Sequence, residues 1–100
     1  MKKSQLFKIV KFWMDKNFNP KDLVIENTED GQKFIKNGIL VMERDDKNFM
    51  FWFNDDLVWD YIETFFNMSY EETELFLELW IEENFEENFE GLGYIVTKIW

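Results

Sequence analysis

Between Lys47 and Lys98 the chain carries thirteen acidic side chains and no basic one. The first fifty residues hold ten bases and eight acids, so the net charge of −10 resides in the second half. Acids without bases in their own segment are expected at the surface of whatever that segment folds into, because unpaired charges are rarely buried. The apolar residues between them are then expected to form the interior.

That interior is rich in aromatic residues. The 100 residues include twelve Phe, five Trp and three Tyr, and 46% of the chain is hydrophobic. This is far more apolar area than a disordered acidic chain carries, and the length suits one compact domain spanning residues 1–100.

The residue types that are missing exclude several kinds of site. With no His and no Cys, the chain has no imidazole base, no thiolate nucleophile and no usual ligand set for zinc, haem or an iron-sulfur cluster. Lys8 and Lys11 interrupt the apolar stretch near the amino end, which does not read as a signal peptide, and no run is long enough for a membrane span. We therefore expect a cytoplasmic protein without a cofactor.

The first half predicts a helix followed by a sheet. Ser4 is expected to cap a helix that runs to about Asn17 and ends before Asn19-Pro20. Its buried stripe follows the three- and four-residue spacing of Leu6, Phe7, Val10, Trp13 and Met14.

Four β-rich segments follow, at residues 23–26, 32–36, 39–43 and 48–53. Asn37-Gly38 suits a two-residue hairpin turn, although Gly38 could equally end a short helix over residues 28–37. An antiparallel meander is the natural arrangement.

After Phe53 the hydrophobic period lengthens towards that of helices. Asn54 or Asp55 is expected to cap a helix through Phe66, and Ser69 with Glu72 forms a capping box for a second helix from Tyr70 to about Asn84. In the first of these helices the residues expected to face inward are Val58, Trp59, Ile62, Phe65 and Phe66.

Gly91 to Gly93 then read as a turn before a last strand over residues 94–98. The fold class is therefore α+β: an N-terminal helix, an antiparallel β meander of 3 to 4 strands, two C-terminal helices and a final strand.

No pattern in the chain predicts catalysis. The adjacent pairs Asp45-Asp46 and Asp55-Asp56 lie where a loop and a helix cap are expected, and carboxylates there are solvated rather than shifted in pKa. We expect no catalytic residue and no metal site, and hence no enzyme. An enzyme that worked with carboxylates alone would need a divalent metal, and Mg²⁺ or Ca²⁺ would raise its melting temperature.

The second C-terminal helix carries a row of glutamates at spacings of three, four and four residues: Glu71, Glu74, Glu78 and Glu82, which Glu86 can extend. Like charges at these spacings cost a helix about 1 kcal/mol in all. The opposite face, with Thr73, Phe76, Leu77 and Trp80, is expected to pack inward. Mixing lysines into the row would give solubility without the repulsion. The row is either a solvated surface without a partner or a field directed at a basic surface.

A single glutamate row is sparser than the phosphates of one nucleic-acid strand, so imitation of a phosphate backbone needs a second acidic element. The preceding helix can supply it through Asp55, Asp56, Asp60 and Glu63. Phe85 and Phe89 are expected to be exposed aromatic anchors beside the acidic contacts.

The block Phe51-Trp52-Phe53-Asn54-Asp55, then Trp59, Phe65-Phe66-Asn67 and Glu71-Glu72 to Trp80, resembles small uncharacterised acidic proteins of tailed phages. The resemblance implies a protein of the host cytoplasm that binds and blocks a host enzyme acting on nucleic acids, as anti-defence inhibitors do. The expected partner is a basic protein surface, without direct contact to nucleic acid or membrane.

The alternative is a self-associating accessory protein. Lys8 and Lys11 on the first helix of one copy could meet the acidic helix of a second copy and form a homodimer.

Overall fold

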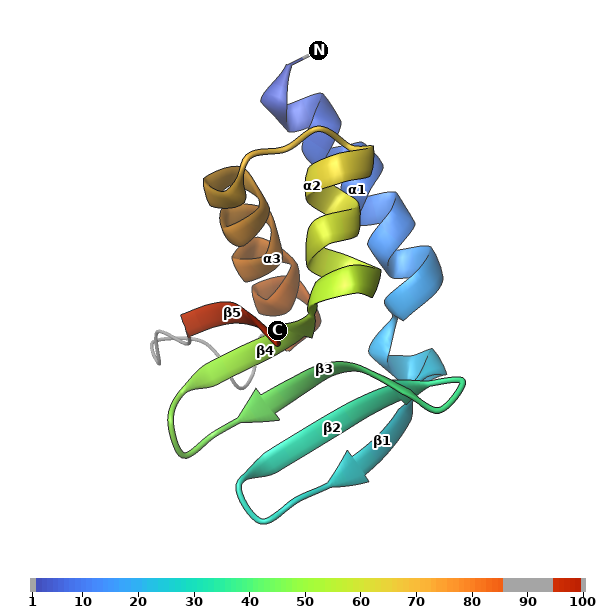
Figure 1. Cartoon of the computed structure of the whole chain (residues 1–100), viewed down its shortest axis with the longest axis vertical. Helices are drawn as coiled ribbons and strands as arrows, with labels where there is room; N and C mark the ends of the chain where they lie inside the picture. The colour runs from blue at the N-terminus through green and yellow to red at the C-terminus, as the bar shows by residue number, and fades with distance from the viewer. Residues whose placement is uncertain (1, 86–94, 100) are drawn as a thin grey trace.

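The computed structural model describes residues 2–85 and 95–99 (Figure 1). In chain order the helices and turns are α1 (Lys3–Phe18), a 3₁₀ turn η1 (Pro20–Asp22), a π-helical turn η2 (Asp55–Trp59), α2 (Asp60–Phe65) and α3 (Tyr70–Asn84). The strands are β1 (Val24–Asn27), β2 (Gly31–Lys36), β3 (Ile39–Asp45), β4 (Met50–Asn54) and β5 (Ile95–Ile99). The predicted α+β class and order of elements are confirmed.

The five strands form one sheet in the order β1-β2-β3-β4-β5. The first four make the predicted antiparallel meander. The fifth lies parallel to β4, with Phe53 opposite Lys98. Parallel neighbours need a crossover connection, which here includes η2, α2 and α3. In Figure 1 the three helices lie together on one side of the sheet.

The turn between β2 and β3 decides between the hairpin and the short helix that were both predicted around residues 28–37. Asn37 and Gly38 both have positive φ, 52° and 79°, as a two-residue hairpin turn requires. Residues 31–36 are strand, so the short helix is wrong. Asp45 stabilises the next turn by accepting hydrogen bonds from the backbone and side chain of Asn48, which lower the pKa of its carboxyl.

The first helix begins earlier than expected. Lys2 is its N-cap and makes no side-chain hydrogen bond, while Ser4 already lies inside the first turn. Ser4 therefore is not the cap, because a capping residue must have non-helical backbone angles. The end is as predicted: the side chain of Asn19 accepts a hydrogen bond from the backbone N–H of Lys21, and Pro20 opens η1.

The core lies between the helices and the sheet. The predicted α1 stripe is confirmed, with Val10 and Met14 fully buried and Leu6, Phe7 and Trp13 packed against them. The fully buried large side chains from the rest of the chain include Phe34, Met42, Phe51, Phe53, Trp59, Ile62, Leu77 and Trp80. Trp80 also donates a hydrogen bond from Nε1 to Asp15 Oδ1 at 2.9 Å, which connects α3 to α1.

The inward face of α2 differs from expectation at one residue. Val58, Trp59 and Ile62 are buried and Phe66 packs against the core, but Phe65 is 68% exposed. The helix ends at Phe65, and the next residue, Phe66, takes the inward place beside Trp13 of α1, with ring centroids 5.6 Å apart. Phe65 is left outside, stacked on Tyr61.

Candidate functional site

The third helix positions its glutamate row as predicted. The capping box is formed: Ser69 Oγ accepts from the backbone N–H of Glu72, and Glu72 Oε1 accepts from that of Ser69. From this start the buried residues of α3 are Thr73, Phe76, Leu77, Trp80 and Ile81. The four carboxylates on the other side, Glu71, Glu74, Glu78 and Glu82, are here called the α3 acidic face; Glu71 and Glu82 are exposed and the middle two are half-buried.

The carboxylates of the α3 acidic face repel one another. Burial raises the pKa of the Glu78 carboxyl above its ordinary value, and the negative charges of Glu74 and Glu82 raise it further. Each of these neighbours is one helical turn away, where side chains of like charge destabilise a helix. The folded protein therefore keeps this negative charge in place at a cost in stability.

No cation of the described residues forms an ion pair with these carboxylates. Over residues 2–85 and 95–99, no lysine or arginine nitrogen lies within 4.0 Å of a carboxylate oxygen of the α3 acidic face. Glu83, on another side of the same helix, differs: Lys11 Nζ lies 3.1 Å from its Oε1. Within the part of the chain that the structure describes, the α3 acidic face is thus a set of carboxylates without ion pairs.

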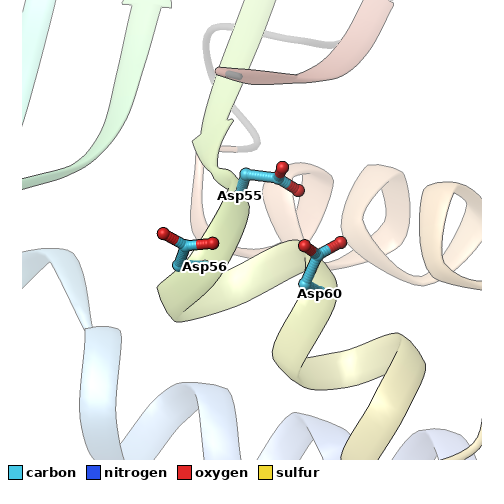
Figure 2. A group of neighbouring side chains, drawn as sticks. All are labelled: Asp55, Asp56 and Asp60. Atoms are coloured by element: carbon cyan, nitrogen blue, oxygen red, sulfur yellow. The ribbon is translucent and has the colours of Figure 1, made fainter.

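The second acidic element begins directly after β4. The side chain of Asn54 accepts a hydrogen bond from the backbone N–H of Leu57, and the chain then enters η2. This turn brings together Asp55, Asp56 and Asp60, here called the aspartate cluster, each with a carboxylate oxygen within 4.8 Å of the others. Figure 2 shows the carboxylates of Asp55 and Asp60 turned toward each other, with Asp56 beside them.

Lys98 of β5 partly neutralises the aspartate cluster. Its Nζ lies 3.3 Å from Asp55 Oδ1 and 3.7 Å from Asp60 Oδ1. Burial disfavours the charged amine, but the contact with Asp55 and the charges of Asp60 and Glu63 outweigh it, so the pKa of Lys98 is raised. Asp55 and Asp60 are therefore not free electrostatic contacts, whereas Asp56 is exposed.

The aspartate cluster has the donor atoms that hard divalent cations prefer, since Mg²⁺ and Ca²⁺ bind carboxylate oxygens. In this arrangement the Lys98 ammonium already contacts two of the three carboxylates. A divalent cation would have to displace it. The geometry is that of an ion-pair network rather than of an open metal centre.

The expectation that Phe85 is an exposed anchor is wrong. Phe85 is partly buried, and its ring packs on those of Phe34 and Phe51, with centroids 5.6 Å and 5.3 Å away. It follows the last turn of α3 and extends the core rather than the surface. Glu86 and Phe89, also expected to contact a partner, lie outside the described residues.

Two apolar residues beside the α3 acidic face escaped the sequence analysis. Leu75 is 40% exposed and Leu79 is 46% exposed, four residues apart on α3. At 100° per residue they fall on the same outer side of the helix as Glu71, Glu78 and Glu82. The four-residue spacing of these leucines in the sequence was the signal that could have identified them.

Comparisons with protein-family models, with curated proteins and with solved structures give no match to this chain. In the part of the chain that the structure describes, no helix has the length and apolar character needed to cross a membrane.

Proposed function

We propose that this chain is a non-enzymatic binding protein that docks its α3 acidic face on a basic surface of a nucleic-acid-handling protein. The resemblance to small phage proteins suggests the biological role in this proposal, which is inhibition of a host enzyme. The observation that carries it is the set of four carboxylates on one helix face, two exposed and two half-buried, without an ion pair among the described residues.

The physical reason is that a partner's lysines and arginines would remove a repulsion that the free protein retains. Three successive like-charge pairs on α3 cost about 1 kcal/mol, and contact with cations would turn this cost into attraction. Such attraction also accelerates association and falls steeply with ionic strength.

The ion pairs of Lys98 narrow the proposed surface. Asp55 and Asp60 belong to an internal network, so the contact surface centres on α3, with Asp56 and Glu63 as its remaining members on the neighbouring elements. Along α3 carboxylates rise ~6 Å per four residues, against ~3.4 Å between phosphates on one strand, so the row matches roughly every second phosphate.

Self-association has less support. Lys11, one of the two lysines expected to meet a second copy, is bound to Asp15 at 2.6 Å and to Glu83 at 3.1 Å within its own chain. A net charge of −10 on each copy also opposes their approach.

The test is affinity capture from a bacterial lysate, with wild-type protein and the variant Glu74→Lys, Glu78→Lys, Glu82→Lys as baits. A matched control, Glu26→Lys, Glu29→Lys, Asp30→Lys, makes the same change in net charge at exposed positions around the β1–β2 turn. We expect the wild type and the control to retain a nucleic-acid-binding protein that duplex DNA or RNA competes away, and the α3 variant to lose it. Equal capture by all three baits would reject the proposal.

A further inference from the structure

The outer side of α3 combines charge with apolar surface. Leu75 and Leu79 leave 40% and 46% of their surface exposed, one helical turn apart. They share that side with Glu71, Glu78 and Glu82. A surface built only to imitate phosphates would not need two leucines, because apolar area gains nothing against a polar, charged groove.

The other flank of α3 shows which kind of partner this combination fits. There the lysine-bearing helix α1 packs against it: the ring of Phe7 meets that of Phe76 edge-on at 5.6 Å, and Lys11 Nζ lies 3.1 Å from Glu83 Oε1. One contact is apolar, and the ion pair is formed beside it. The outer side of α3 offers the same two ingredients, leucines and glutamates.

From this repetition we propose that the outer side of α3 binds an α-helix of the partner, one that carries apolar residues a turn apart with lysines or arginines beside them. This inference rests on the proposed function, since it gives a shape to the basic surface. The partner's apolar residues pack on Leu75 and Leu79, and its cations meet the α3 acidic face.

The spacing favours a helix over other elements. Leu75 and Leu79 are separated by ~6 Å along the axis of α3, and residues i and i+4 of a partner helix have the same separation. The side chains of such a helix can therefore pack into the gap between the two leucines. An added β-strand would need backbone hydrogen-bond partners at a sheet edge, which a helix does not offer.

The experiment uses a synthetic helical peptide of lysine and leucine, with the leucines spaced by three and four residues so that they form one face. A permuted peptide of identical composition scatters the leucines around the helix. Affinity for the full-length protein is measured by calorimetry at physiological ionic strength. We expect the patterned peptide to bind at least about tenfold more tightly than the permuted one.

Two variants separate this inference from the proposed function. Leu75→Gln, Leu79→Gln keeps helix propensity and charge, and should weaken binding of the patterned peptide about tenfold. Val24→Gln is the control, because Val24 is 65% exposed on β1, away from α3. Glu78→Lys, Glu82→Lys should abolish binding. Thermal melting of each variant confirms that it is folded.

The outcomes are distinct. If the leucine variant binds as tightly as the wild type while the glutamate variant does not bind, the outer side of α3 binds through charge alone. The helix inference is then rejected, and the proposed function stands. Equal binding by the glutamate variant rejects both. Equal affinity for the two peptides rejects the helix inference. A concentration-dependent dimer of the wild type that the leucine variant lacks would assign the leucines to a second copy and overturn it.

Discussion

The two acidic regions of this molecule both carry several carboxylates close together, but their electrostatics differ. In the aspartate cluster, Lys98 reaches two of three carboxylates, and the ion pairs are completed within the chain. On the α3 acidic face four carboxylates have no such cation among the described residues. Burial raises the pKa of Glu78, and the charges of Glu74 and Glu82 raise it further. Acidic content by itself therefore does not show which carboxylates remain without a cation; the positions of the few cations do.

The largest expected effect concerns binding. Reversal of two charges on α3, Glu78→Lys with Glu82→Lys, should lower the salt concentration at which captured partner elutes far more than reversal of two charges at the other region, Asp56→Lys with Glu63→Lys. The change in net charge is equal, so a difference reports position. Equal shifts would mean that Asp56 and Glu63 contribute as much to binding as the two α3 charges, and would remove the distinction between the regions.

Removal of the cation should destabilise the aspartate cluster. Loss of one partner from a fully buried ion pair costs ~3–5 kcal/mol, and Lys98→Met should cost less, about 1–2 kcal/mol, because 33% of the Lys98 side chain is exposed. Urea unfolding measures the difference. Lys21→Met, at an exposed position, is the control and should change little.

A second substitution tests the cause of that loss. Asp55→Asn in the Lys98→Met background should recover part of the stability, because it removes the carboxylate that was left without its cation. Additive losses from the two substitutions would show that Lys98 acts through packing instead.

Removal of a charge on α3 should stabilise the protein, whereas removal of Lys98 should destabilise it. Glu78→Gln deletes two repulsive pairs, with Glu74 and Glu82, and should stabilise the protein by about 0.5–1 kcal/mol, since each pair costs ~0.2–0.5 kcal/mol and Glu78 is half-buried. Glu83→Gln on the same helix breaks the contact with Lys11 and should not stabilise. If both variants melt at the same temperature, the α3 acidic face is not under electrostatic strain.

The sequence was sufficient where structure depends on neighbouring residues. The Ser69–Glu72 capping box predicted the start of α3 to the residue, because this cap is made by two side chains three positions apart. Asn37-Gly38 indicated a hairpin turn but left a short helix over residues 28–37 open, and the positive φ of both residues decides for the hairpin. The prediction that Phe65 faces inward was wrong because the short α2 helix ends at this residue. A hydrophobic period does not show which of two adjacent phenylalanines turns inward.

The electrostatic difference between the regions lay beyond local patterns. Lys98 reaches Asp55 only because β5 lies parallel to β4 with Phe53 opposite Lys98, and these two strands are separated in the sequence by η2, α2 and α3. The sequence identified Lys98 as the first base after Lys47, but not the strand it would lie beside. Phe85 likewise required the tertiary structure, since its partners Phe34 and Phe51 are on β2 and β4.

The two regions should also respond to pH at opposite ends of the scale. The pKa of Glu78 is raised above its ordinary 4.5, so the folded state binds this proton more tightly than the unfolded state, and the penalty of the charged form disappears as pH falls through the folded pKa. The advantage of Glu78→Gln at neutral pH should therefore shrink in acid.

The pKa of Lys98 is raised above 10.5, so its stabilisation holds below that pH and is lost as pH rises through the folded pKa. The deficit of Lys98→Met should shrink in alkali. Urea unfolding of each variant against wild type across both ranges checks the two trends.

The smallest effect, a few tenths of a kcal/mol, is expected from salt. It separates the repulsion along α3, whose outer members Glu71 and Glu82 are exposed, from the attraction between Lys98 and Asp55. Added NaCl screens charges that face water, so the gain in stability from Glu78→Gln should decline as ionic strength rises. Asp55 is only 20% exposed, and the ions reach its contact with Lys98 less readily, so the deficit of Lys98→Met should persist over the same range. Unfolding free energies of the wild type and both variants in low and high NaCl measure the two slopes. If the Lys98→Met deficit declined as steeply as the Glu78→Gln gain, the two regions would be equally open to solvent, and the aspartate cluster would be as available to an outside partner as the α3 acidic face.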